Sequence, residues 1–142
     1  MRGSKPVQSC EIRKVVPFHD LDPLNIVWHG NYLKYFDEAR FELFAGAGID
    51  LHAYYRKHQM LFPVTKTSTK YILPLKHRDR FVCRATVTEA RMKIVMDFEI
   101  RRLHTKELCT RGRSEQVAVQ YPQQEIMFDI PGDIAAALGF DE

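Results

Sequence analysis

The spacing of apolar residues predicts one long helix, from residue 31 to about residue 46. Apolar side chains recur there every three or four positions, which places them on one face of a helix: Tyr32, Leu33, Phe36, Ala39, Leu43, Phe44 and Ala47. Asn31 is expected to cap the first turn by accepting a backbone hydrogen bond, and Gly46 and Gly48 suit the helix end. The breadth of this aromatic stripe predicts a well-buried helix.

Much of the remaining chain alternates between apolar and polar positions, as half-buried antiparallel strands do. Strands are expected over residues 62–71, 81–88, 94–101 and 117–121, after a β-branched strand over 12–18 whose end is marked by Pro17. Residues 51–59 fit a second short helix or an irregular link, and residues 131–138 fit a short C-terminal helix. One strongly apolar helix with about five strands predicts an α+β fold, with an antiparallel sheet wrapped around the helix.

Length and composition fit one globular domain covering residues 1–142. The chain is 45% apolar and 27% charged, and no apolar run is long enough for a transmembrane helix. Its formal net charge of +3 is too small to indicate nucleic-acid binding. The three cysteines, Cys10, Cys83 and Cys109, include no C-x-x-C pair, which favours free thiols and a cytoplasmic location.

Positive charge is concentrated in one part of the chain. Residues 76–113 hold eleven Lys or Arg and five Asp or Glu, whereas the rest of the chain is slightly acidic. One interpretation is that these charges line the solvated faces of strands. The other is a docking patch for an anionic ligand, because local positive potential attracts anions even when the net charge is small.

Residues 18–40 hold the candidate chemistry. Asp20 and Asp22 follow a predicted strand, and the predicted helix opens at His29 to Asn31. A helix N-terminus presents unpaired N–H groups that can stabilise an oxyanion, while a nearby carboxylate can act as a base or nucleophile. An acid here also fits an ordinary turn, so spacing alone leaves both readings open. His19, Asp20, Asp22 and His29 match no standard metal-binding spacing, and no metal site is expected.

The same segment, FHDLDPLNIVWHGNYLKYFDEAR, resembles the 4-hydroxybenzoyl-CoA thioesterase family of the hot-dog fold, which includes acyl-CoA thioesterases encoded with the Tol–Pal system. The matching positions are Phe18, Asp20-Leu21-Asp22-Pro23, Ile26-Val27-Trp28, Asn31-Tyr32 and Ala39-Arg40. The resemblance implies a hydrolase of acyl-CoA or acyl-carrier-protein thioesters that needs no metal or redox cofactor. It also implies a homodimer or homotetramer with active sites at the subunit interface.

The resemblance assigns roles to individual residues. Asp22 matches the essential carboxylate, which attacks the thioester carbonyl or activates a water molecule. The backbone N–H of His29 matches the group that polarises the substrate carbonyl, with the amide of Gly30 beside it. Asp20 is expected to organise the loop. The family usually has glycine where this chain has Asn25, a residue that tolerates the left-handed backbone such a turn needs.

Substrate contacts follow from the same comparison. Asn25 and Tyr32 are expected to line the substrate pocket. Arg91 and Lys93 match part of a basic run that contacts CoA phosphates, although Met92 interrupts it. Two alternatives remain open on this fold: a module that binds acyl thioesters without turnover, and a hydratase or dehydratase.

Overall fold

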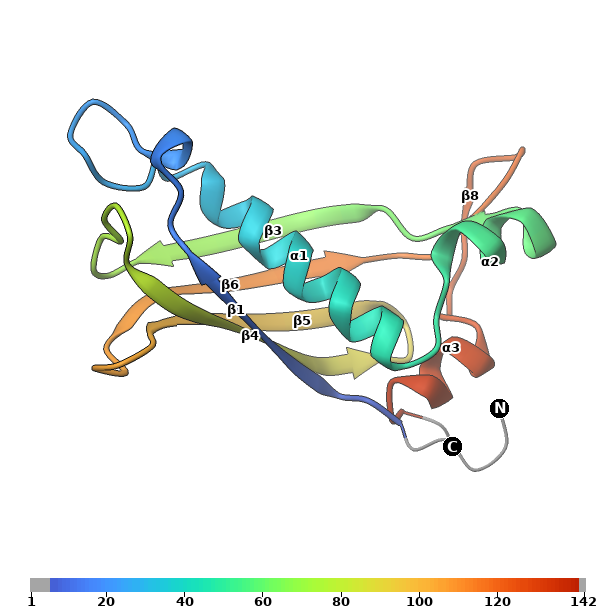
Figure 1. Ribbon diagram of the computed structural model, residues 1–142. Helices are drawn as coiled ribbons and strands as arrows, with labels where there is room; N and C mark the ends of the chain where they lie inside the picture. The colour runs from blue at the N-terminus through green and yellow to red at the C-terminus, as the bar shows by residue number, and fades with distance from the viewer. Residues whose placement is uncertain (1–5, 141–142) are drawn as a thin grey trace.

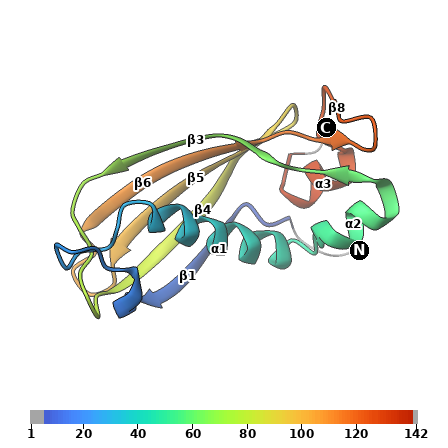
Figure 2. The same ribbon diagram turned by 90° about the horizontal axis from the view of Figure 1, so that it is seen from above.

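An antiparallel sheet of five strands curves around one long helix, α1 (Asn31–Gly46), in the computed structural model, which describes residues 6–140 (Figures 1 and 2). In spatial order the strands are β1 (Ser9–Val15), β4 (Arg80–Ala90), β5 (Ile94–Arg102), β6 (Leu108–Gln116) and β3 (Val64–Tyr71). This architecture confirms the predicted α+β hot-dog fold. The first five and last two residues of the predicted domain lie outside the described range.

The helix packs its aromatic stripe onto the inner face of the sheet. The Tyr35 ring lies 4.9 Å from the Phe81 ring, and the Phe36 ring stacks on Phe98 at 4.6 Å, measured between centroids. A side chain at Gly112 would run into the Phe36 ring, so glycine lets β6 approach the helix closely. The predicted burial is confirmed for the stripe as a whole, whereas Leu33 is 40% exposed.

The start of α1 differs from the prediction. Gly30 is the N-cap and makes no side-chain capping bond, while Asn31 is the first helical residue. The Asn31 side chain instead donates from Nδ2 to the carbonyl oxygen of Asp20, 2.9 Å away. The predicted capping role of Asn31 is therefore wrong, because its amide is used to hold the preceding loop. Gly48 takes a left-handed backbone conformation (φ 76°) just past the helix end, as expected.

The remaining elements gather at the opposite end of the sheet from the N-terminus of α1 (Figure 1). Residues 51–59 form a helix, α2 (Leu51–His58), whose N-cap Asp50 accepts from the Ala53 amide at 3.0 Å. A small second sheet joins β2 (Met60–Leu61), β7 (Val119–Gln120) and β8 (Glu125–Ile126). The predicted C-terminal helix is α3 (Gly132–Ala137), with Pro131 at its N-cap.

Strand β6 is the principal element that the pattern missed. A strand was predicted over 117–121, but the long strand ends at Gln116 and only the two-residue β7 follows. The inward positions of β6 include Gly112, Ser114 and Gln116, so apolar alternation is absent. Two of these side chains make buried hydrogen bonds: Ser114 Oγ accepts from Arg40 at 2.9 Å, and the Gln116 amide group donates to the Phe62 carbonyl at 2.8 Å.

The first strand and the cysteines complete the comparison with the sequence. β1 covers Ser9–Val15 rather than 12–18, and Phe18–Asp20 forms a short 3₁₀ helix after Pro17. Cys10, Cys83 and Cys109 are free thiols, as predicted. None of the described helices is both long and apolar enough to cross a membrane.

Candidate active site

The loop that carries Asp22 is a tight hairpin at the start of the helix. Leu21 and Val27 pair as an isolated antiparallel bridge, and the Asp22 amide donates to the Ile26 carbonyl at 2.8 Å. The Asn25 amide closes the turn on the Asp22 carbonyl at 2.9 Å, and Asn25 itself has φ 65°. The expectation that asparagine supports a left-handed turn here is confirmed.

The Asp22 carboxylate is half-buried and only partly engaged by the protein. Its Oδ1 accepts from the Leu24 amide at 2.8 Å, which fixes the side chain against its own turn. Within residues 6–140, Oδ2 has no hydrogen-bond partner. One oxygen therefore orients the carboxylate while the other stays available for a substrate or a water molecule.

Two backbone N–H groups lie free in the turn that leads into α1. The Trp28 amide donates to the Asp20 carbonyl and the Asn31 amide to the Trp28 carbonyl, each at 2.9 Å. Between them, the amides of His29 and Gly30 have no acceptor among the residues that the structure describes. The Trp28 ring covers Gly30 so closely that a side chain at Gly30 would collide with it. Such a pair of N–H groups can bind a developing negative charge.

Asp20 ties this loop to the helix. Its buried carboxylate accepts from the Lys34 ammonium at 2.7 Å and from the Tyr35 hydroxyl at 2.6 Å. Burial opposes ionisation, but the hydrogen bonds from Lys34 and Tyr35 and the Lys34 charge outweigh it and hold the pKa of Asp20 below its usual value. Since the Asp20 carbonyl also accepts from Trp28, the same residue links the carboxylate loop, the amide turn and the helix.

Lys34, Tyr35 and Tyr71 are site neighbours that the sequence pattern did not single out. Lys34 falls on the polar side of the predicted helix and Tyr35 outside the predicted stripe, so neither signals a partner for Asp20. Tyr71 ends a strand and donates from its hydroxyl to the His29 carbonyl at 3.1 Å. The sequence signal for Lys34 and Tyr35 is their closeness to the D-x-D segment. For Tyr71 it is a weaker similarity to the 4-hydroxybenzoyl-CoA thioesterase family, which continues through this residue and does not indicate the contact with His29.

Tyr32 lies deeper than the other predicted site residues. It is 3% exposed, and its hydroxyl accepts from the Leu75 amide at 3.2 Å. Its ring packs against the rings of Tyr35 and Tyr71, at 5.9 and 5.5 Å between centroids. Tyr32 therefore supports the wall behind the exposed Tyr71.

Within one chain, Arg91 and Lys93 lie at the opposite end of the sheet from Asp22. They form the turn between β4 and β5, whereas the Asp22 loop lies beside the start of β4, an eleven-residue strand of about 36 Å. Lys93 pairs with Glu115 at 2.9 Å and Arg91 is exposed. A cleft of about 1010 Å³ beside Arg91 is lined largely by apolar side chains, among them Met60, Met92, Met127, Ile130 and Phe140. Within a single chain, Arg91 and Lys93 therefore do not lie near Asp22.

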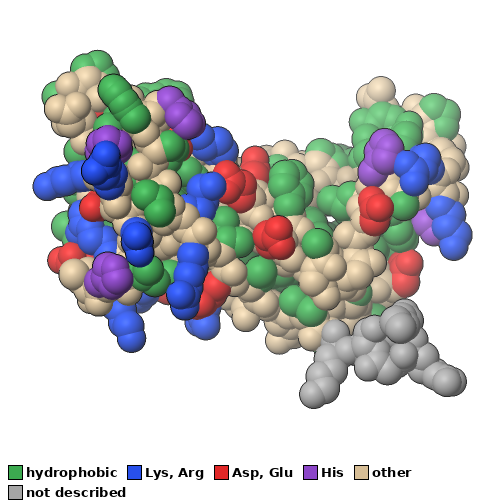
Figure 3. Space-filling view, viewed as in Figure 1, with side chains coloured by type: hydrophobic (Ala, Val, Ile, Leu, Met, Phe, Trp, Pro, Cys, Tyr) green, Lys and Arg blue, Asp and Glu red, His purple; other side chains and the backbone are tan. Residues whose placement is uncertain are grey.

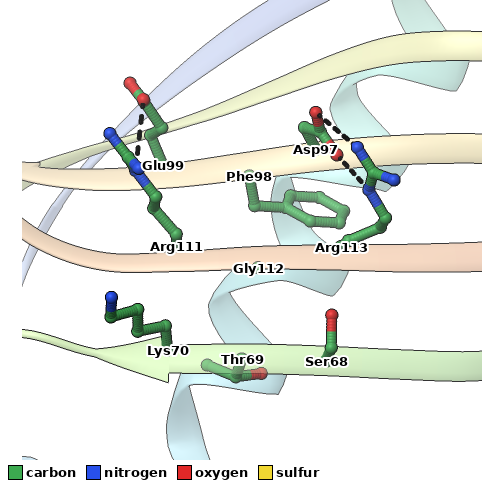
Figure 4. Close-up of a pocket in the computed structure, with 9 residues that line it drawn as sticks. All are labelled: Ser68, Thr69, Lys70, Asp97, Phe98, Glu99, Arg111, Gly112 and Arg113. Atoms are coloured by element: carbon green, nitrogen blue, oxygen red, sulfur yellow. Dashed lines mark hydrogen bonds and ion pairs between the residues drawn. The ribbon is translucent and has the colours of Figure 1, made fainter.

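Six of the eleven cations of the basic segment form ion pairs, several of them on the outer face of the sheet. A groove of about 460 Å³ lies on the side of the sheet away from α1. In it Arg113 pairs with Asp97 at 2.8 Å and Arg111 with Glu99 at 4.0 Å (Figure 4). This pairing supports the interpretation of the charges as solvated strand faces. Lys, Arg and His also gather at the end that holds the Asp22 loop (Figure 3), where Ile26 pairs with Lys76 as an isolated bridge.

Within residues 6–140, no three side chains of the metal-binding types gather closely enough to hold an ion. The predicted site residues are thus divided. Asp22, Asn25 and the amides of His29 and Gly30 lie in one loop segment, Tyr32 is buried behind it, and Arg91 and Lys93 lie at the β4–β5 turn.

Known proteins resemble this chain in sequence and in fold. The chain is 26% identical over 87 residues to 1,4-dihydroxy-2-naphthoyl-CoA hydrolase from Thermosynechococcus vestitus, covering 61% of this chain and 58% of that relative's length. Among solved structures, a 1,4-dihydroxy-2-naphthoyl-CoA thioesterase from Synechocystis superposes with TM-score 0.85 at 19% identity, over 92% of this chain and 95% of that one. The 4-hydroxybenzoyl CoA thioesterase from Pseudomonas sp. strain CBS-3 gives 0.82 at 18% identity, over 92% and 99%. The family model of the thioesterase-like superfamily matches residues 16–138, and the chain belongs to that superfamily.

Proposed function

We propose that this protein hydrolyses acyl thioesters of CoA, or of an acyl carrier protein, with Asp22 as the catalytic carboxylate. The observation that carries the proposal is the hairpin that holds Asp22 and leads directly into the turn of His29 and Gly30. Among residues 6–140, Asp22 Oδ2 and the His29 and Gly30 amides have no hydrogen-bond partner. Membership of the thioesterase-like superfamily and the CoA hydrolase named above support the choice of a thioester.

The chemistry needs only these groups and water. Either Asp22 takes a proton from a water molecule that attacks the thioester carbonyl, or its oxygen attacks to give a mixed anhydride that water then cleaves. In both routes the carbonyl oxygen becomes negative as the new bond forms, and the two amides stabilise it. In the first route the tetrahedral species collapses by breaking the carbon–sulfur bond, the proton held by Asp22 passes to the departing thiolate, and the free acid remains. In the second route the same bond breaks as the anhydride forms; water then cleaves the anhydride, which gives the free acid, restores the Asp22 carboxylate and supplies the proton of the thiol.

The direct experiment measures thiol release from short-chain, long-chain and aromatic acyl-CoAs, with one acyl-carrier-protein thioester for comparison. We expect enzyme-dependent release from at least one of these substrates, with the free acid as the second product. Binding of acyl-CoA with no release from any substrate would identify a binding module and contradict the proposal. Water addition to an enoyl thioester without thiol release would identify a hydratase.

We also propose a homodimer, or a tetramer of such dimers, joined through the free edge of β3. This strand pairs with β6 on one side, and all but one of its residues are exposed. Antiparallel pairing of two copies would set the Tyr71 end of one β3 beside the Val64 end of the other. Both Val64 and Ile94 pair with Gln116, so the partner's β4–β5 turn would approach this chain's Asp22 loop.

In such a dimer Arg91 and Lys93 would serve the active site of the partner by binding CoA phosphates. The double change Arg91→Ala with Lys93→Ala is expected to raise KM for acyl-CoA about tenfold and to leave kcat within about twofold, because phosphate contacts far from the thioester act on ground-state and transition-state binding alike. Steady-state kinetics on the homodimer check this. An unchanged KM would remove both residues from the site.

A mixed dimer tests whether the site is shared. One subunit carries Asp22→Asn and the other carries the Arg91→Ala and Lys93→Ala pair, separated by different affinity tags. If the two groups act across the interface, one site of the mixed dimer is complete and shows a wild-type KM. If they act within one chain, the only site with Asp22 lacks both cations and keeps the raised KM.

We place this activity in the cytoplasm, which the three free thiols support.

A further inference from the structure

The end of β3 contacts the turn that holds the free amides. Tyr71 is the last residue of that strand, and its hydroxyl donates to the carbonyl oxygen of His29 at 3.1 Å. The Tyr32 amide also approaches this oxygen but lies farther away, at 3.4 Å. The hydrogen bond from the Tyr71 phenol is therefore the shorter of the two that hold the His29 carbonyl.

The backbone at Tyr71 and at the two residues after it is held against strand β6. Tyr71 pairs with Thr110 of β6, and the amides of Ile72 and Leu73 both donate to the Cys109 carbonyl, at 2.9 and 3.0 Å. Its ring packs edge-on against Tyr32 at 5.5 Å. The hydroxyl is thus held by regular structure, although the side chain is 49% exposed.

The carbonyl that Tyr71 holds belongs to the same peptide group as the Gly30 N–H. Because that group is planar, fixing the direction of its C=O also fixes the direction of its N–H. A hydrogen bond to the oxygen further polarises the group and strengthens the N–H as a donor. The Trp28 ring packs against Gly30, so the free N–H is positioned from two sides.

We propose that Tyr71 is a positioning residue for the reaction: its hydroxyl orients and polarises the His29–Gly30 peptide so that the Gly30 N–H meets the oxyanion. This inference rests on the proposed thioester hydrolysis and extends it to a residue on the edge strand. The His29 N–H belongs to a different peptide group, whose Trp28 carbonyl is held by the Asn31 amide, so Tyr71 acts on one of the two donors.

The test compares Tyr71→Phe with Tyr54→Phe. Each change removes one phenol hydroxyl and keeps the ring; Tyr54 donates to Asp133 at 3.0 Å, between α2 and α3 and away from the Asp22 loop. In Tyr71→Phe we expect kcat to fall about three- to tenfold with KM within about twofold, because the lost hydrogen bond acts on the transition state. In Tyr54→Phe both constants should stay at their wild-type values.

A second readout does not depend on turnover. With ¹³C and ¹⁵N labels, Tyr71→Phe should move the His29 carbonyl carbon and the Gly30 amide nitrogen upfield, and Tyr54→Phe should move neither. An unchanged His29 carbonyl shift, or an unchanged kcat beside an inactive Asp22→Asn, would overturn the inference. A wild-type protein that releases no thiol would instead overturn the proposed function, a result that the carbonyl shift does not affect.

Discussion

Asp22→Asn is expected to lower kcat for thioester hydrolysis by about 10²–10⁴-fold, the range that a catalytic acid or base contributes. Asparagine has nearly the same shape, and its side-chain oxygen can still accept from the Leu24 amide, so the turn should survive. What is lost is the negative charge, without which the group neither takes a proton from water nor attacks a carbonyl. Thiol release under saturating acyl-CoA measures the effect.

The matched control for this change is Asp50→Asn. Asp50 is an exposed aspartate whose side chain also accepts one backbone hydrogen bond, from Ala53, but at the N-cap of α2. Its replacement should leave kcat unchanged. Wild-type turnover in Asp22→Asn, with an unaltered thermal midpoint in both variants, would remove Asp22 from the mechanism.

Asp20→Ala is expected to have the largest effect on stability, about 2–3 kcal/mol, equivalent to about 5–10 °C in Tm. The change leaves the Tyr35 hydroxyl, whose residue is fully buried, without its acceptor. It also removes the partner of Lys34, although that ammonium is partly exposed and can be rehydrated. Thermal and urea unfolding of the two proteins give the difference.

Adding Tyr35→Phe to Asp20→Ala should recover part of the lost stability, because the unpaired hydroxyl is then gone. The Asp20 effect should also depend on pH. Since the pKa of Asp20 is lowered in the fold, its carboxylate stabilises the protein fully above the ordinary aspartate range, about pH 4, and loses this contribution as the pH falls below it. A gap between wild type and Asp20→Ala that stays constant down to pH 2 would contradict the assignment.

The sequence predicted the parts of the fold that depend on regular periodicity. The α1 stripe and the alternation in β4 and β5 reflect burial on one face, which a pattern of apolar residues records directly. Strand β6 was not predicted because its inward face includes Gly112, which lets the helix approach closely, and polar residues that form buried hydrogen bonds. The Asn31 side chain was misassigned because its acceptor, the Asp20 carbonyl, is set by the loop fold rather than by local propensity.

The candidate site divides in the same way. Asp22 and the amides of His29 and Gly30 lie within eight residues of one another along the chain, so a short motif could indicate them. The contacts of Asp20 with Lys34 and Tyr35, and of Tyr71 with His29, join segments that meet only after the sheet has wrapped the helix. No pairing rule applied to one sequence specifies such contacts, because many exposed tyrosines and lysines have equivalent local surroundings.

The Asp22 loop and the cleft beside Arg91 lie at opposite ends of the sheet, and this separation affects how the sequence can diverge. The Asp22 hairpin is held by Asp20, Lys34 and Tyr35, while the cleft beside Arg91 is lined by the β4–β5 turn, the small sheet and the C-terminal segment. The two sets share no residue. Substitutions that reshape the cleft can therefore accumulate without moving the Asp22 carboxylate or its turn, so that under the proposed function substrate preference can change during evolution while the catalytic geometry stays constant.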